Sequence, residues 1–182
     1  MGTSKTRTRR PRAAGAQGWL HPAVRVQYSP ISGRGLFTGE AIAAGAVVAT
    51  LAGRLVDGAE LTRLLIAASH EHRYLDTIGV DNDLHLILPP NQPIHYGNHS
   101  CDPTLWHDGA YTLVARRDLE PDTELTVDYA TQTVEPDFRM PCNCRAPGCR
   151  GVVTGTDWQL PGWALRYRGH VVPPVAARLN ER

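Results

Sequence analysis

Four cysteines restrict what this 182-residue chain can fold into more than any other feature of its sequence. One stands alone at Cys101, and the other three form the pattern C-x-C-x4-C at Cys142, Cys144 and Cys149. Cysteines two positions apart lie close together, and a Pro-Gly turn inside the pattern lets the chain fold back to bring in the third. Three thiolates leave a tetrahedral zinc ion one ligand short, and Cys101 is the one cysteine that remains. We therefore expect a zinc ion held by all four cysteines.

Disulfides and unpaired thiols are the alternatives to this zinc site. The N-terminal charges have no apolar run behind them, so we expect no secretory signal and an intracellular, cytoplasmic location, where disulfides are rare. Unpaired thiols need no such clustering. A zinc ion with four thiolate ligands has no open position for a substrate, so its role would be structural and its binding energy would be folding energy.

Composition and charge predict one globular domain with a basic tail. No apolar run approaches the roughly 18 residues that cross a bilayer, so no membrane partner is expected. Five basic residues and no acid fall within residues 1–12, which leaves 14 basic against 18 acidic residues in the rest of the chain. An acidic body attracts a basic peptide better than nucleic acid, so nucleic acid is not the expected partner. We expect residues 1–20 to be a solvated, disordered tail. The strong bias toward arginine over lysine hints at a bacterial source.

Short apolar runs separated by glycine and proline predict a mainly β or α+β domain. Leucines recur at helical spacing within residues 60–68, which predicts a helix there. The expected strands are residues 24–28, 35–37, 46–51, 84–88, 112–115 and 124–129, and the stretch 157–167 is expected to form a short helix docked on the core.

Three segments, in this order, resemble the SET-domain family of protein-lysine methyltransferases. Residues 32–37, SGRGLF, resemble its G-x-G entry motif, residues 98–103 match its NHSCDP segment, and residues 124–129, ELTVDY, match ELTFDY in all but one position. The C-x-C-x4-C-R-G stretch resembles the post-SET zinc loop, whose fourth ligand in the family is the cysteine of NHSC, here Cys101. The likeness runs from about residue 22 to residue 155.

This resemblance implies a fold of small β-sheets with a pseudoknot, in which the NHSC and DY segments pass through one another's loops. The SET domain would occupy residues 21–132 and the zinc loop residues 138–154. Residues 155–182 would pack on the core.

The resemblance also implies S-adenosylmethionine (AdoMet) as methyl donor. The glycines of the entry motif would let the backbone approach the cofactor, since a Cβ would block contact there, although a plain turn explains them when taken alone. Trp158 or Trp163 would cover the adenine or pack in the core, and His95 is a further possible contact. His70 and His72 are expected on the surface. Tyr74 and Leu75 resemble the YL strand that precedes the knot in the family. The expected cofactor-binding residues are Gly33, Arg34, Gly35, Leu36, Tyr74, Asn98 and His99, with packing as the alternative role of Tyr74.

Tyr129 resembles the catalytic tyrosine of the family, and Val127 and Tyr96 would line the substrate pocket. The family usually carries Phe or Tyr where Val127 stands, so we expect a roomier pocket that permits di- or trimethylation, or an amine other than lysine. The expected activity is methyl transfer to a protein lysine, with self-methylation at Lys5 as an added possibility. Alternatives are a methyltransferase for a small-molecule or carrier-protein amine, a catalytically silent SET-fold binding module, and a zinc-loop nucleic-acid binder that uses the arginine tail.

Overall fold

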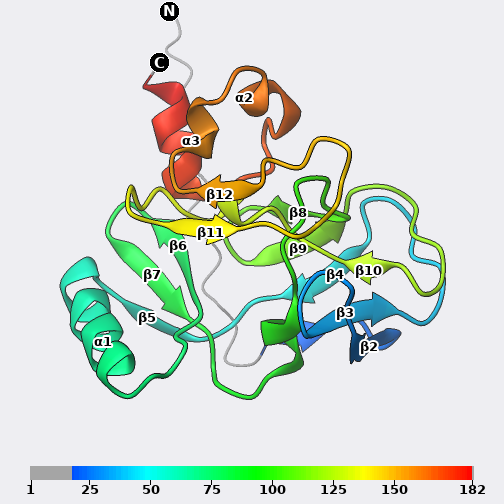
Figure 1. Cartoon of the computed structure of the whole chain (residues 1–182), viewed down its shortest axis with the longest axis horizontal. Helices are drawn as coiled ribbons and strands as arrows, with labels where there is room; N and C mark the ends of the chain where they lie inside the picture. The colour runs from blue at the N-terminus through cyan, green and yellow to red at the C-terminus, as the bar shows by residue number, and fades with distance from the viewer. Residues whose placement is uncertain (1–17, 182) are drawn as a thin grey trace, which may run out of the picture.

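The computed structural model describes residues 18–181, which form four small antiparallel sheets and a few short helices (Figure 1). The expected mainly β, α+β class is confirmed. Residues 1–17, with most of the predicted tail and Lys5, lie outside the described residues. None of the helices in residues 18–181 has the length and apolar composition needed to span a bilayer.

The first two sheets lie against each other in the right half of Figure 1 and contain most of the entry motif. One has the order β1-β4-β9-β8, and the other has the order β10-β3-β2. Their strands are β1 (Trp19–Leu20), β2 (Val24–Tyr28), β3 (Arg34–Thr38), β4 (Val47–Thr50), β8 (Leu105–Asp108), β9 (Thr112–Ala115) and β10 (Glu124–Leu125).

The third sheet, at the left of Figure 1, has the order β5-β7-β6 and carries the long helix α1. The Asp57 side chain caps α1 by accepting a hydrogen bond from the Glu60 amide at 2.8 Å, as expected for an N-cap residue. Leu61 faces the core, whereas Leu65 is half-exposed. The elements are β5 (Arg54–Val56), α1 (Gly58–His70), β6 (Thr77–Asp81) and β7 (Leu84–Ile87). His70 and His72 are exposed, as expected.

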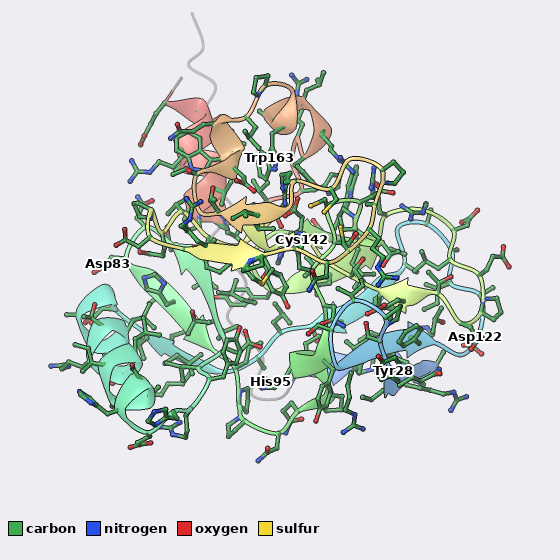
Figure 2. The ribbon with its side chains drawn as sticks, viewed as in Figure 1. Tyr28, Asp83, His95, Asp122, Cys142 and Trp163 are labelled. Carbon is green, nitrogen blue, oxygen red and sulfur yellow. The ribbon has the colours of Figure 1, made fainter. Side chains whose placement is uncertain are left out.

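The C-terminal part forms a two-stranded hairpin covered by short helices at the top of Figure 1. Trp163, labelled in Figure 2, is buried with Tyr167 and Val175 in the core, and its ring lies 4.6 Å from that of Tyr167. Trp158 packs at the edge of the same core. The elements are β11 (Arg139–Pro141), β12 (Val152–Thr154), the 3-10 helix η3 (Asp157–Gln159), α2 (Trp163–Arg166) and α3 (Pro173–Asn180).

Three sequence-based expectations were wrong. Residues 124–129 are not one strand, because β10 ends at Leu125 and Asp128 caps the 3-10 helix η2 (Tyr129–Thr131). Tyr74 and Leu75 precede β6 and do not lie in a strand. The stretch 157–167 is two short helical pieces, since Gly162 adopts φ 75° between them, and α3 was not predicted at all.

Candidate active site

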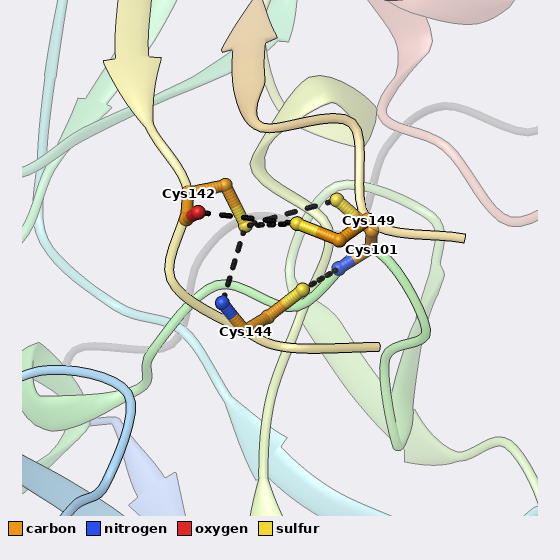
Figure 3. A group of neighbouring side chains, drawn as sticks. All are labelled: Cys101, Cys142, Cys144 and Cys149. Atoms are coloured by element: carbon orange, nitrogen blue, oxygen red, sulfur yellow. Dashed lines mark hydrogen bonds between the residues drawn. The ribbon is translucent and has the colours of Figure 1, made fainter. Parts of the chain in front are cut away.

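The four cysteine sulfur atoms form one cluster, in which all lie within 4.8 Å of one another (Figure 3). The Sγ of Cys142 is 3.8 Å from that of Cys101 and 3.6 Å from that of Cys149. These separations are far longer than the roughly 2.05 Å of a disulfide, and all four cysteines are free. The cluster thus brings together the four residues predicted as zinc ligands.

The backbone around the cluster directs N–H groups at the sulfur atoms. The amide of Cys101 donates to the Sγ of Cys144, and the amide of Arg150 donates to the Sγ of Cys101, both at 3.4 Å. Such donors favour thiolates, which are the form that binds a metal. Four sulfurs at this spacing suit a tetrahedral zinc ion with no open position, so the residues present fit the predicted metal.

Arg150 and Asp128 connect the cysteine cluster to the segment before Tyr129. Asp128 has 0% exposure, and the Arg150 guanidinium donates to both of its carboxylate oxygens, at 2.8 and 2.6 Å. The Tyr167 hydroxyl donates to the same carboxylate at 2.6 Å. Arg150 also forms an ion pair with the buried Asp157, with Nε and Oδ2 3.1 Å apart. The cysteine loop and the segment before Tyr129 therefore share one buried charge network.

His99 links the NHSC segment to the tyrosine predicted to be catalytic. Its Nδ1 accepts a hydrogen bond from the Tyr129 amide at 3.1 Å, and its Nε2 lies 3.4 Å from the Sγ of Cys101. Burial lowers the pKa of His99 to about 4, although Asp128 opposes this shift, so the ring is neutral at physiological pH. A parallel bridge joins His99 to Val127. The two segments predicted to meet in the pseudoknot lie side by side.

Tyr129 lies at the wall of a cavity that opens to solvent, with its hydroxyl held in place. The hydroxyl donates to the carbonyl oxygen of Gly97 at 2.8 Å. Burial, reinforced by the nearby Tyr74 and Asp76, raises the pKa of Tyr129 well above its ordinary value. The phenol therefore stays protonated, and its oxygen lone pairs remain available to accept a hydrogen bond.

The cavity has a volume of about 430 Å³, and its walls are mainly apolar with several polar groups among them. Val127, Leu36 and Ile94 contribute apolar surface, and Tyr129 contributes its ring. Asp76, Glu135 and Asp137 line the cavity, and no lysine or arginine is among the described residues that line it. An apolar cavity lined by carboxylates and by no basic side chain among the described residues suits a cationic side chain better than an anionic one.

Most residues predicted to bind AdoMet lie at the start of β3 and in the NHSC segment, and Leu36 and Tyr74 also line the cavity. The Asn98 amide donates to the carbonyl oxygens of Ser32 and Arg34, at 3.2 and 3.0 Å, which ties the NHSC segment to the entry motif. A Cβ at Gly33 would meet no atom within 4 Å, so this loop has open space beside it. At Gly35 a Cβ would lie 2.4 Å from Oε1 of Glu124. A Cβ at Gly35 would displace the Glu124 carboxylate, so packing gives a reason for glycine here in addition to the predicted approach of the cofactor.

Two predicted site residues lie elsewhere than expected. Tyr96 does not line the cavity. Its ring lies 4.7 Å from the Arg34 guanidinium, and its hydroxyl oxygen accepts a hydrogen bond from that group at 3.4 Å. Tyr74 is 79% exposed and borders the cavity that contains Tyr129 and Val127.

Sequence reasoning also missed several residues of the site. Asp76 and Phe138 line the cavity, and Arg150 and Tyr167 hold Asp128. The arginine next to the last cysteine was visible in the C-R-G stretch. Asp76 stands in no motif, so no signal in the sequence pointed to it.

The fold and the site define an α+β domain in which a four-cysteine loop closes beside a tyrosine-walled cavity. Residues 33–130, more than half of the chain, match the family model of the SET domain. The chain belongs to the SET domain family, and the predicted resemblance is confirmed.

Curated relatives are named as histone-lysine N-methyltransferases. The chain is 31% identical over 145 residues to one from Aspergillus oryzae described as H3 lysine-4 specific, covering 70% of this chain and 11% of the relative. It is 34% identical over 144 residues to one of the same description from Cryptococcus neoformans, covering 70% and 9%. It is 38% identical over 81 residues to TRX1 of Oryza sativa, covering 41% and 8%. The chain thus spans about a tenth of the length of these relatives.

Proposed function

We propose that this protein transfers a methyl group from AdoMet to the ε-amine of a protein lysine, with Tyr129 as the catalytic tyrosine. One observation carries the proposal. The Tyr129 hydroxyl is fixed by Gly97 at the wall of a cavity that three carboxylates line, and this cavity lies within a domain of the SET family. The names of the relatives support a lysine substrate.

The residues predicted to hold AdoMet fit such a ligand. The open space beside Gly33 leaves room for a cofactor, and the Asn98 amide fixes the backbone of residues 32–34 next to it. Arg34 is exposed at this loop and offers a guanidinium for a carboxylate. Residues 33–36, Asn98 and His99 would hold AdoMet, which supplies an activated methyl group when bound.

The amine must be neutral when it reacts. A free lysine has a pKa of about 10.4, so at pH 7 deprotonation costs roughly 4–5 kcal/mol. Burial in an apolar cavity lowers the pKa of a lysine by up to about 3–5 units, which recovers most of this cost. Because the Tyr129 hydroxyl donates to Gly97, its oxygen accepts a hydrogen bond from the amine. That bond aims the nitrogen lone pair and holds the amine in a reactive position.

We further propose that the four cysteines hold one structural zinc ion. The spacing of the sulfurs supports this assignment. The ion would fix the loop that carries Arg150, and through Arg150 the position of Asp128 beside Tyr129.

The test is incorporation of a labelled methyl group from AdoMet into protein substrates. Wild-type protein should label lysine-containing peptides or lysate proteins, and Tyr129→Phe should lose at least 100-fold in rate while it still binds AdoMet in calorimetry. Tyr28→Phe is the matched control, because this tyrosine is 82% exposed and does not border the cavity. Loss of a self-labelled band in Lys5→Arg would add self-methylation.

Other outcomes separate the alternatives. AdoMet binding with label found only on small or carrier-protein amines would replace the protein-lysine substrate. AdoMet binding without any methyl transfer would leave a silent binding module. Folded, zinc-loaded protein that binds no AdoMet would refute the catalytic proposal.

A further inference from the structure

Asp76 and His95 form a pair in the wall of the cavity that contains Tyr129. Asp76 lies just before β6, and His95 lies in the 3-10 helix η1 (Pro93–Tyr96), between the sheet of β7 and the sheet of β3 in Figure 2. The Nδ1 of His95 is 3.2 Å from Oδ2 of Asp76, and each side chain is 20% exposed. The pair therefore touches both the cavity and the solvent.

The other nitrogen of His95 determines where protons can sit. Nε2 contacts the carbonyl oxygen of Pro89. A carbonyl oxygen only accepts hydrogen bonds, so Nε2 carries the hydrogen. Nδ1 then either bears a lone pair facing the Asp76 carboxylate, giving the pair a charge of −1, or shares one proton with it, giving a neutral pair. One site for one proton is thus built into the cavity wall.

The surroundings of the pair favour uptake of a proton from a cation in the cavity. Tyr74, Tyr129, Glu135 and Asp137 line the same cavity. Burial raises the pKa of both tyrosines, and Asp76 is close enough to raise the pKa of each further. No arginine or lysine among the described lining residues competes for the carboxylate. Burial raises the pKa of Asp76, and His95 partly offsets this effect.

We propose that the Asp76–His95 pair accepts the proton that the substrate ammonium must lose before methyl transfer. This inference rests on the proposed function. The N–H bond of the ammonium breaks, its electron pair stays on nitrogen, and the proton moves to the site between Oδ2 and Nδ1. An ammonium and a pair of charge −1 become a neutral amine and a neutral pair. The solvent-exposed side of the pair then releases the proton to water.

The simpler alternative is that the pair only braces the segment before β6 against η1. The two roles differ in their dependence on pH. With an acceptor present, kcat/KM levels off once the pair has lost its proton. Without one, only the neutral amine reacts, and kcat/KM rises tenfold per pH unit up to the lysine pKa of about 10.4.

The test is the pH profile of kcat/KM on a lysine peptide for wild type, Asp76→Asn and His95→Gln. We expect wild type to reach a plateau above neutral pH. We expect Asp76→Asn to be lower by on the order of 100-fold at pH 7 and to rise tenfold per pH unit until it approaches wild type. A peptide that carries the less basic thialysine should recover part of the loss at pH 7. Asp108→Asn is the control, because Asp108 is exposed and does not line the cavity.

The affinity for AdoMet and the thermal midpoint show whether each variant is folded. If Asp76→Asn does not fold, His95→Gln provides the measurement instead. The proposal is overturned if the folded variants give pH profiles of kcat/KM parallel to that of wild type and the thialysine peptide does not raise their kcat/KM. The pair would then only brace the segment before β6 against η1. A wild-type protein that methylates no lysine would instead refute the proposed function itself.

Discussion

Replacing Arg150 with methionine should destabilise the protein by about 3 kcal/mol. The substitution leaves Asp128 buried at 0% exposure without its cation and removes the ion pair to Asp157. Breaking a buried ion pair by removing one partner typically costs about 3–5 kcal/mol. The hydroxyl of Tyr167 and the amide of Ala130 still donate to Asp128, so the lower end of this range applies.

Urea unfolding of zinc-loaded protein measures this loss, and the thermal midpoint should fall by about 10 °C at roughly 2–4 °C per kcal/mol for a chain of this size. Arg178→Met is the control, since it breaks an exposed ion pair between Arg178 in α3 and Glu181 just after α3. This change should lower the free energy of unfolding by less than about 0.5 kcal/mol. Adding Asp128→Asn to Arg150→Met removes the stranded charge and should restore at least about 1 kcal/mol. The reasoning is refuted if Arg150→Met lowers the free energy of unfolding no more than Arg178→Met does. It is also refuted if Asp128→Asn destabilises the Arg150→Met variant as much as it destabilises wild type.

Three further results are expected. Burial lowers the pKa of His107 to about 4, from about 6.5 in the unfolded chain. As the pH falls from 6.5 to 4, only the unfolded chain binds a proton at this histidine, which favours unfolding. His107 should therefore account for about 2 kcal/mol of the stability lost between pH 7 and pH 5. Urea midpoints at the two pH values should show a smaller difference in His107→Gln, and an unchanged difference would contradict the assignment. Zinc analysis should find one ion per chain, and a strong chelator should lower the thermal midpoint by more than 10 °C until zinc is returned; a metal-free protein of unchanged stability would exclude the site. Wild type should yield di- or trimethylated lysine by mass spectrometry and Val127→Phe mainly monomethylated lysine, because the ring refills the cavity; purely monomethylated product from wild type would count against the roomy pocket.

The sequence predicted those strands and clusters that depend on neighbouring residues in the chain. Residues 24–28 and 112–115 have the predicted bounds of β2 and β9, since apolar runs there end at turn residues. The cysteine spacing predicted the cluster of four, because its members are few and chemically distinctive.

Long-range contacts decided where the predictions failed. Residues 124–129 have strand-forming composition, but the chain turns at Asp128, whose carboxylate binds Arg150, 22 positions away. Tyr96 was assigned to the substrate pocket from its place beside His95, and in the structure its ring lies against Arg34. Asp76 was not predicted as a site residue, since its importance comes from lying beside His95 in the cavity wall. No pattern in the neighbouring sequence reports such a contact.

The arrangement of the site has a consequence for the order in which a growing chain can fold. The parallel bridge from His99 to Val127 and the contact from Asp128 to Arg150 both close long loops, which is slow compared with forming a hairpin. A nascent chain that has emerged only as far as residue 130 contains the whole NHSC–Tyr129 segment but lacks Arg150 and three of the four cysteines. In this unfinished chain Asp128 has no Arg150 guanidinium to pair with, and the cysteine loop has not yet formed. Such an unfinished chain would expose apolar surface and depend on chaperones, and only after Arg150 has left the ribosome can the site assemble.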